Sequence, residues 1–196
     1  MTEAEVLEEY ADLFDGVGLL EGDVHFDVDD TVPAIQMPLR RLPIAVRDKV
    51  EAELKRLESD GIIARVTEPT KWVSALLVVA KPDGRIRTCI DLQYLNKALK
   101  RVQYCMPTID DVLPKLTGVK ILSSIDTKEG IFHLKLDRES SLLTTTETPF
   151  GRIRWLRVPF GVKVAPEIFA DRIHAALSGL NNIAIIVDDI LVAGSG

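Results

Sequence analysis

Hydrophobic and polar positions in the first half of the chain predict one long helix and one hairpin. The segment 44–60 is amphipathic and is followed by Gly61, with an apolar stripe at helical spacing made by Val46, Val50, Leu54 and Leu57. Two strand-like runs, WVSALLVVA and RIRTCIDL, flank KPDG at 81–84, which is a favourable turn sequence. Residues 1–43 are expected to form a short acidic helix and then an extended lead-in punctuated by prolines.

The C-terminal two-thirds of the chain alternates between helix-like and strand-like segments. A cap-like Thr108 predicts a helix, and the strand that follows ends at Asp126. Further strands with a hairpin at PFG are expected over 133–160, before a helix that opens with Pro166. The run 181–194 then has the order strand, Asp-Asp, strand. This order favours the α+β class, with helices on one face of an antiparallel sheet.

Charge is distributed unevenly, although the net charge is −6. Residues 1–30 contain eleven Asp or Glu and no Lys or Arg, so the other 166 residues carry 24 basic and 19 acidic groups, a net of +5. Six basic residues lie between Lys81 and Arg101, which suits a polyanionic ligand as well as an ordinary solvated surface. No apolar run reaches the roughly 18–20 residues of a membrane span. The acidic N-terminus is unlike a secretory signal, and the two cysteines form no CxxC pair. We therefore expect a soluble, intracellular, cytoplasmic protein with no membrane partner.

An acidic pair, Asp188 and Asp189, stands between two apolar runs in NNIAIIVDDILVAG. After Arg172 the sequence contains no Lys or Arg, so no cation nearby in sequence neutralises the pair. If the strand that ends at Asp126 neighbours these strands, three carboxylates converge at one sheet edge and form an oxygen site suited to Mg²⁺. Two such ions roughly 3.5–4 Å apart support phosphoryl transfer. Aspartates at strand ends are also common turn formers, and both interpretations stay open on the residues alone.

Four blocks of the sequence occur in the order and at the spacing of the fingers and palm of reverse transcriptases. They are KPDGRIRTCIDLQYLNKALK, PTIDDVLPKLTGVKILSSIDTKEG, TPFGRIRWLRVPFGVKVAPEIF and IIVDDILV. Over roughly residues 8–196 the chain resembles the Pol polyprotein of gypsy-type LTR retrotransposons. The resemblance implies an α+β fold with a ferredoxin-like palm, whose antiparallel sheet is backed by helices, and RNA-directed DNA polymerase activity. It also implies a place inside cells, including retroelement particles.

The resemblance assigns a catalytic and metal-binding role to three aspartates, Asp126, Asp188 and Asp189. The family uses such aspartates to hold two Mg²⁺ ions, with Mn²⁺ as a substitute, while the primer 3′-hydroxyl attacks the α-phosphate of a deoxynucleoside triphosphate. It assigns nucleotide contacts to five positions: Lys81, Arg87, the backbone around Thr127, Ile131 and Phe160. Without the resemblance, Lys81 and Arg87 are a solvated hairpin tip. The implied partners are an RNA or DNA template with its primer, deoxynucleoside triphosphates, and the remainder of a Pol polyprotein.

The resemblance also divides the chain. Residues 1–43 are the lead-in, 44–100 and 134–164 match the fingers, and 101–133 and 165–196 match the palm. Because the chain ends soon after the last hairpin, the thumb, connection and RNase H regions are expected to be absent.

Three residues depart from the family pattern. Ile186 stands where YxDD has Tyr, and Glu129 replaces a small polar residue and adds negative charge near the metals. Ile131 stands where the family usually has Tyr or Phe, a steric gate against the ribose 2′-hydroxyl, although Phe132 is adjacent. These departures leave a second interpretation open, a catalytically degenerate remnant that keeps the fold and binds nucleic acid.

Overall fold

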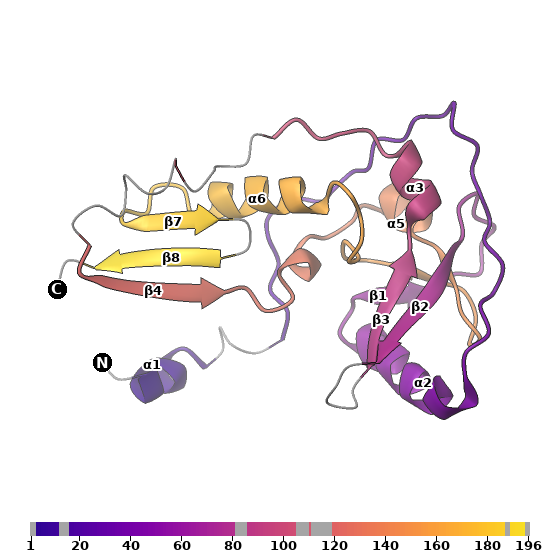
Figure 1. Cartoon of the computed structure of the whole chain (residues 1–196), viewed down its shortest axis with the longest axis horizontal. Helices are drawn as coiled ribbons and strands as arrows, with labels where there is room; N and C mark the ends of the chain where they lie inside the picture. Colours follow the sequence, from indigo (N-terminus) through magenta and orange to yellow (C-terminus); the bar gives the residue numbers. More distant parts are fainter. Residues whose placement is uncertain are drawn as a thin grey trace.

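Two β-sheets lie at opposite ends of an elongated molecule and are connected by extended chain (Figure 1). The computed structural model describes residues 3–11, 16–80, 86–104, 110, 119–186 and 189–194. Within those ranges no helix has the length and apolar character needed to cross a membrane. The segment predicted as a helix from Thr108 lies outside the described residues, except Asp110.

The smaller sheet has three antiparallel strands, β4 (Ile121–Asp126), β7 (Ile183–Ile186) and β8 (Asp189–Gly194). β8 is the central strand, so the last hairpin is paired with a strand that comes about 60 residues earlier in the chain. The helix α6 (Ala165–Ala176) lies near the end of β7 (Figure 1), and its Ile173 shares a buried cluster with Ile185 of that strand. As predicted, this part is an antiparallel sheet backed by a helix.

The larger sheet has the strand order β1-β6-β5-β2-β3 and is mixed rather than purely antiparallel. The predicted hairpin is confirmed, since β2 (Ser74–Ala80) pairs in antiparallel register with β3 (Ile86–Asp91). The short strands β1 (Ile63–Arg65), β5 (Thr146–Glu147) and β6 (Ile153–Trp155) complete the sheet. β5 pairs parallel with β2, which joins the hairpin to a segment more than fifty residues later.

The predicted amphipathic helix is α2 (Ile44–Ser59). Its stripe packs into the core through three of the four expected side chains, Val50, Leu54 and Leu57, which are at most 1% exposed. Gly61 has φ +66°, and its N–H donates to the Glu58 carbonyl, so a residue without Cβ ends the helix as predicted. A second short helix, α3 (Gln93–Ala98), follows β3.

One predicted strand is helical instead. Residues Arg138–Leu143 form α5, although SLL within it was expected to begin a strand. Asp137 caps this helix by accepting a hydrogen bond from the Ser140 N–H at 2.7 Å, and the buried Ser140 hydroxyl accepts one from the Phe26 N–H. A local cap and a long-range contact therefore outweigh the strand-like composition.

As expected, the lead-in is a short helix, α1 (Glu3–Glu9), and then an extended strap over residues 16–43. Its bridges run from Val24 to Leu136, from Val28 to Leu99 and from Gln36 to Val73. The buried Val24 and Phe26 anchor it in the main core, which also contains the two tryptophans, Trp72 and Trp155.

Candidate active site

The end of β4 brings two of the three predicted aspartates together. In the register of β4 and β8, Asp126 lies directly opposite Asp189, and both residues are exposed. Residues opposite each other in an antiparallel pair have Cβ atoms about 4.5–5.5 Å apart. The expected adjacency of these strands is thus confirmed for Asp126 and Asp189. Asp188 lies outside the described residues.

The chain turns sharply after Asp126 and enters η3 (Gly130–His133), a 3₁₀ helix. A Cβ on Gly130 would lie 2.7 Å from Thr127 Oγ1 and 2.9 Å from Cζ of Phe169, so only glycine fits between the turn and α6. The Gly130 N–H donates to the Thr127 carbonyl, whereas the N–H groups of Lys128 and Glu129 have no backbone acceptor among the described residues. Such open amides suit an anion.

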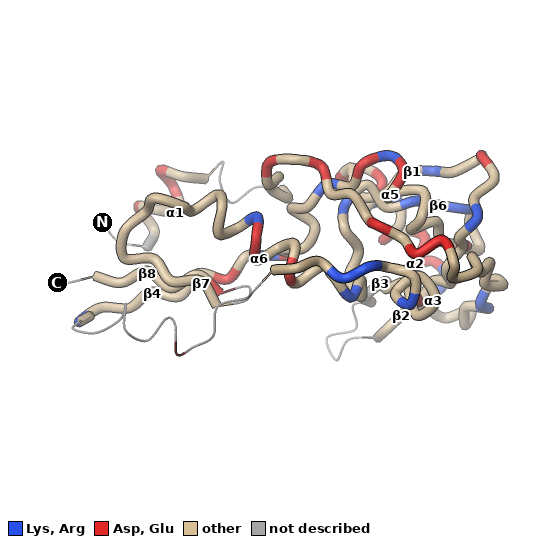
Figure 2. The backbone as a smooth tube through the Cα atoms, turned by 90° about the horizontal axis from the view of Figure 1, so that it is seen from above, with Lys and Arg blue, Asp and Glu red and all other residues tan. Residues whose placement is uncertain are grey.

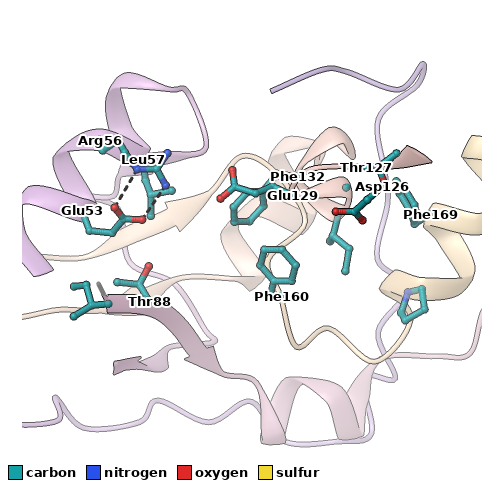
Figure 3. A pocket seen from close by; sticks show the side chains of 14 residues that line it. Glu53, Arg56, Leu57, Thr88, Asp126, Thr127, Glu129, Phe132, Phe160 and Phe169 are labelled. Carbon is teal, nitrogen blue, oxygen red and sulfur yellow. Dashed lines mark hydrogen bonds and ion pairs between the residues drawn. The ribbon is translucent and has the colours of Figure 1, made fainter. Parts of the chain in front are cut away.

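A cavity of about 470 Å³ opens beside this turn (Figure 3). Four of the predicted site residues line it: Asp126, Thr127, Ile131 and Phe160. Asp189, opposite Asp126, is the first residue of the central strand β8 and is not among the residues that line the cavity. Lys81 lies outside the described residues; Arg87 pairs with Val79 in β3, and its side chain lies outside the described part of the chain.

The aromatic next to the gate position faces the core. Phe132 is 5% exposed, and its ring stacks on Trp155 at 5.9 Å and meets Phe160 edge-on at 4.9 Å between centroids. Phe132 is therefore held by two aromatic neighbours, while the half-buried Ile131 side chain lines the cavity next to it. The cavity wall at position 131 is aliphatic.

The opposite wall of the cavity is a surface that sequence reasoning missed. Glu53, Arg56 and Leu57 of α2 line it, although this helix was interpreted only through its buried stripe. The Arg56 Nε and Nη2 donate to the two Glu53 carboxylate oxygens at 3.0 and 2.8 Å, and Nη1 donates to Asp60 at 2.8 Å. These charged residues are three and four positions apart, a spacing that predicts ion pairs on a helix surface. Nothing in the spacing indicates that the surface faces a cavity.

Comparison with known proteins decides the family. Residues 79–196 match the family described as reverse transcriptase (RNA-dependent DNA polymerase). The chain belongs to the reverse transcriptase family. Its curated relatives include an uncharacterised protein of Caenorhabditis elegans, 33% identical over 99% of this chain and 16% of that protein. The retrovirus-related Pol polyprotein of transposon 412 from Drosophila melanogaster is 31% identical over 79% of this chain and 13% of that protein.

The fold is that of a solved reverse transcriptase. A foamy viral protease–reverse transcriptase in complex with an RNA/DNA hybrid matches with a TM-score of 0.81 and 20% identity, over 98% of this chain and 26% of that chain. The reverse transcriptase chain described here thus spans a small part of the length of these relatives. It is the reverse transcriptase domain of a Pol polyprotein of retrotransposon or retroviral type.

The charges of this reverse transcriptase domain fit a divalent cation at the sheet edge. Lys and Arg lie mainly around the larger sheet and its helices (Figure 2). Within the described ranges no Lys or Arg forms an ion pair with Asp126 or Asp189, so the two carboxylates are not neutralised by a side chain. The same ranges contain no group of three His, Cys, Asp or Glu that could hold a metal ion by itself. The two opposed carboxylates are hard oxygen donors of the kind that Mg²⁺ binds.

Proposed function

We propose that this chain is the fingers and palm of the reverse transcriptase of a gypsy-type LTR retroelement, and that it catalyses RNA-directed DNA synthesis. One observation carries the proposal: Asp126 opposes Asp189 at the point where β4 opens into a cavity lined by Thr127, Ile131 and Phe160. A carboxylate pair beside a cavity with open backbone amides suits a metal-bound triphosphate. The likeness to the Pol polyprotein of a Drosophila transposon supports the retroelement origin.

Each group has a role in this proposal. Asp126 and Asp189, with Asp188 beside them in sequence, would hold two Mg²⁺ ions, which supply activation of the primer hydroxyl and charge stabilisation at the transferred phosphate. In this proposal the open amides of the turn after Asp126 donate hydrogen bonds to phosphate oxygens, and Phe160 lies against the nucleotide. Lys81 and Arg87 contribute positive charge from the hairpin of β2 and β3.

The division into fingers and palm follows the two sheets. Residues 44–100 and 134–164 contain every strand of the larger sheet, and 101–133 and 165–196 contain β4, β7 and β8. The partners we propose are a primed RNA or DNA template, deoxynucleoside triphosphates and the rest of a Pol polyprotein. The RNA/DNA hybrid bound by the foamy viral neighbour and the Lys and Arg residues along the larger sheet and its helices (Figure 2) support this choice.

Calorimetric titration of Mn²⁺ in the presence of dTTP tests the metal site directly. Mn²⁺ favours the same oxygen ligands as Mg²⁺ and binds more tightly. We expect Asp126→Asn and Asp189→Asn each to weaken Mn²⁺ binding by roughly tenfold, the effect of losing about 1.4 kcal/mol. Asp48→Asn, which removes an exposed carboxylate on α2, is the matched control and should bind like the unmodified chain.

Single-nucleotide incorporation on a primed RNA template then separates the two functional interpretations. Incorporation that disappears in Asp189→Asn identifies a polymerase. Template binding without incorporation, together with Mn²⁺ binding that is indifferent to Asp126→Asn, identifies the degenerate remnant and refutes the catalytic proposal.

A further inference from the structure

The far wall of the cavity places a cation opposite the phosphate-binding turn. Arg56 projects from α2, and the Glu129 carboxylate points across the cavity toward it (Figure 3). Glu53 and Asp60 engage three of the five N–H donors of Arg56, which fixes the guanidinium plane and leaves one N–H on each terminal nitrogen. Two carboxylates therefore hold the Arg56 guanidinium at the rim of the cavity, although its side chain is 44% exposed.

The charge balance of the cavity is unfavourable for an anionic ligand. Among its described lining residues, three carry carboxylates, Glu53, Asp126 and Glu129, and one, Arg56, carries a positive charge. Metal ions would neutralise Asp126, and Glu53 is already paired with Arg56. Glu129, like Asp126, has no ion-pair partner within 4 Å among the described residues, but it has no proposed metal to neutralise it.

The turn geometry keeps Glu129 in place. Its backbone is left-handed, with φ +54°, a conformation that costs a residue with Cβ about 1 kcal/mol. The next residue, Gly130, is wedged against Phe169, so the turn cannot slide away from α6. The half-buried Glu129 side chain therefore stays in the cavity, beside the open amides of the turn.

Electrostatic coupling across the cavity supports the pairing of these two walls. The hydrogen bond to Glu53 raises the pKa of Arg56 against the opposing effect of burial. The field of Glu53 adds to this increase, followed by those of Glu129 and Asp60. Glu129 thus acts on the Arg56 guanidinium although it belongs to a different part of the chain.

We propose that Arg56 is a positioning residue for the incoming nucleotide: it offsets the Glu129 carboxylate, so that the triphosphate meets no like-charge barrier at the turn. The inference rests on the proposed nucleotide-binding function of this cavity. It assigns a role in substrate binding to a helix of the proposed fingers, through the longer-range attraction between Arg56 and Glu129 on facing walls.

The test is a double-mutant cycle on nucleotide affinity in the full 196-residue chain. Mg²⁺–dTTP is titrated by calorimetry into the unmodified protein, Arg56→Gln, Glu129→Gln and the double variant. We expect Arg56→Gln to weaken binding by about threefold, as for a partly exposed charge pair. Glu129→Gln should bind at least as tightly as the unmodified chain, and Arg56→Gln should have no further effect in that background.

Two controls separate charge from structure. Lys55→Gln removes a neighbouring cation of α2 that pairs with Glu51 and does not line the cavity, so it should leave nucleotide affinity unchanged. Arg56→Lys keeps the charge and loses the two-pronged bond to Glu53, so it should retain most of the affinity. Thermal unfolding of each variant confirms that the titrations are made on folded protein.

The outcomes are distinct. A loss in Arg56→Gln that persists in the Glu129→Gln background shows that Arg56 does not act through Glu129 and overturns the inference. So does an affinity equal to that of the unmodified chain. If the unmodified chain binds no Mg²⁺–dTTP, the proposed function itself fails and the inference fails with it. Suppression of the loss by Glu129→Gln confirms the inference.

Discussion

Replacing Gly130 by alanine probes the contact that positions the active-site turn. Gly130 has no positive φ, so its backbone alone would accept alanine. The added Cβ would lie 2.7 Å from Thr127 Oγ1 and 2.9 and 3.3 Å from two ring carbons of Phe169. Thr127 can rotate its hydroxyl, but the Phe169 ring is 3% exposed and packed in the core, so it cannot retreat.

The size of the effect follows from overpacking. Inserting one carbon into a close-packed site costs about 1–3 kcal/mol. Restricting the unfolded chain by a Gly-to-Ala change returns about 0.4–1 kcal/mol. We therefore expect Gly130→Ala to lower the free energy of unfolding by about 1–2 kcal/mol, or about 2–8 °C in Tm for a chain of this size.

Urea unfolding followed by tryptophan fluorescence measures this loss, and Gly194→Ala is the matched control. A Cβ at Gly194 would meet its nearest neighbour, Ile121 Cβ, at 3.6 Å, an ordinary contact. Gly194→Ala therefore restricts the unfolded chain to the same extent as Gly130→Ala, but without the clash. Equal unfolding midpoints for Gly130→Ala and Gly194→Ala would refute the reasoning, because the clash would then have no energetic consequence.

Two further predictions concern the gate and the strap. Ile131→Tyr should raise selectivity for deoxynucleotides over ribonucleotides in competitive incorporation, because a ring at this aliphatic position would narrow the cavity. Unchanged selectivity would contradict this prediction. Ile131→Leu is the control. The His25 ring is hydrogen-bonded to the Asp137 carboxylate at 2.6 Å, and this bond raises the pKa of His25 above 6.5. Burial acts to raise the pKa of Asp137, but the hydrogen bonds from Ser140 and His25 together outweigh it and lower that pKa. The pair's contribution is therefore complete between the unfolded pKa values, near pH 4 to 6.5, and disappears as pH rises through the raised pKa of His25. In urea unfolding, His25→Ala should lower the free energy of unfolding by up to about 1 kcal/mol near pH 6 and leave it unchanged near pH 9. An equal loss of unfolding free energy at both pH values would contradict the assignment.

Local patterns in the sequence were sufficient for the elements whose stabilising contacts are local or periodic. The stripe of α2 repeats at helical spacing, and β2 and β3 are adjacent in sequence on either side of the turn sequence KPDG, so both elements were predicted. The meeting of Asp126 with Asp189 was anticipated through the order of the sequence blocks and the resemblance they carry, whereas the residues alone left it conditional on the two strands being neighbours. These inferences depend on nearby residues or on the order of blocks along the chain.

The remainder was decided by contacts between distant residues. SLL within α5 has strand-like composition, and its helix depends on the Asp137 cap and on a hydrogen bond from Phe26, more than a hundred residues away in sequence. The charged face of α2 reads as ordinary surface, and only tertiary packing sets Arg56 across a cavity from Glu129. Side-chain periodicity records which face of an element is buried, whereas what the other face meets depends on how the elements pack.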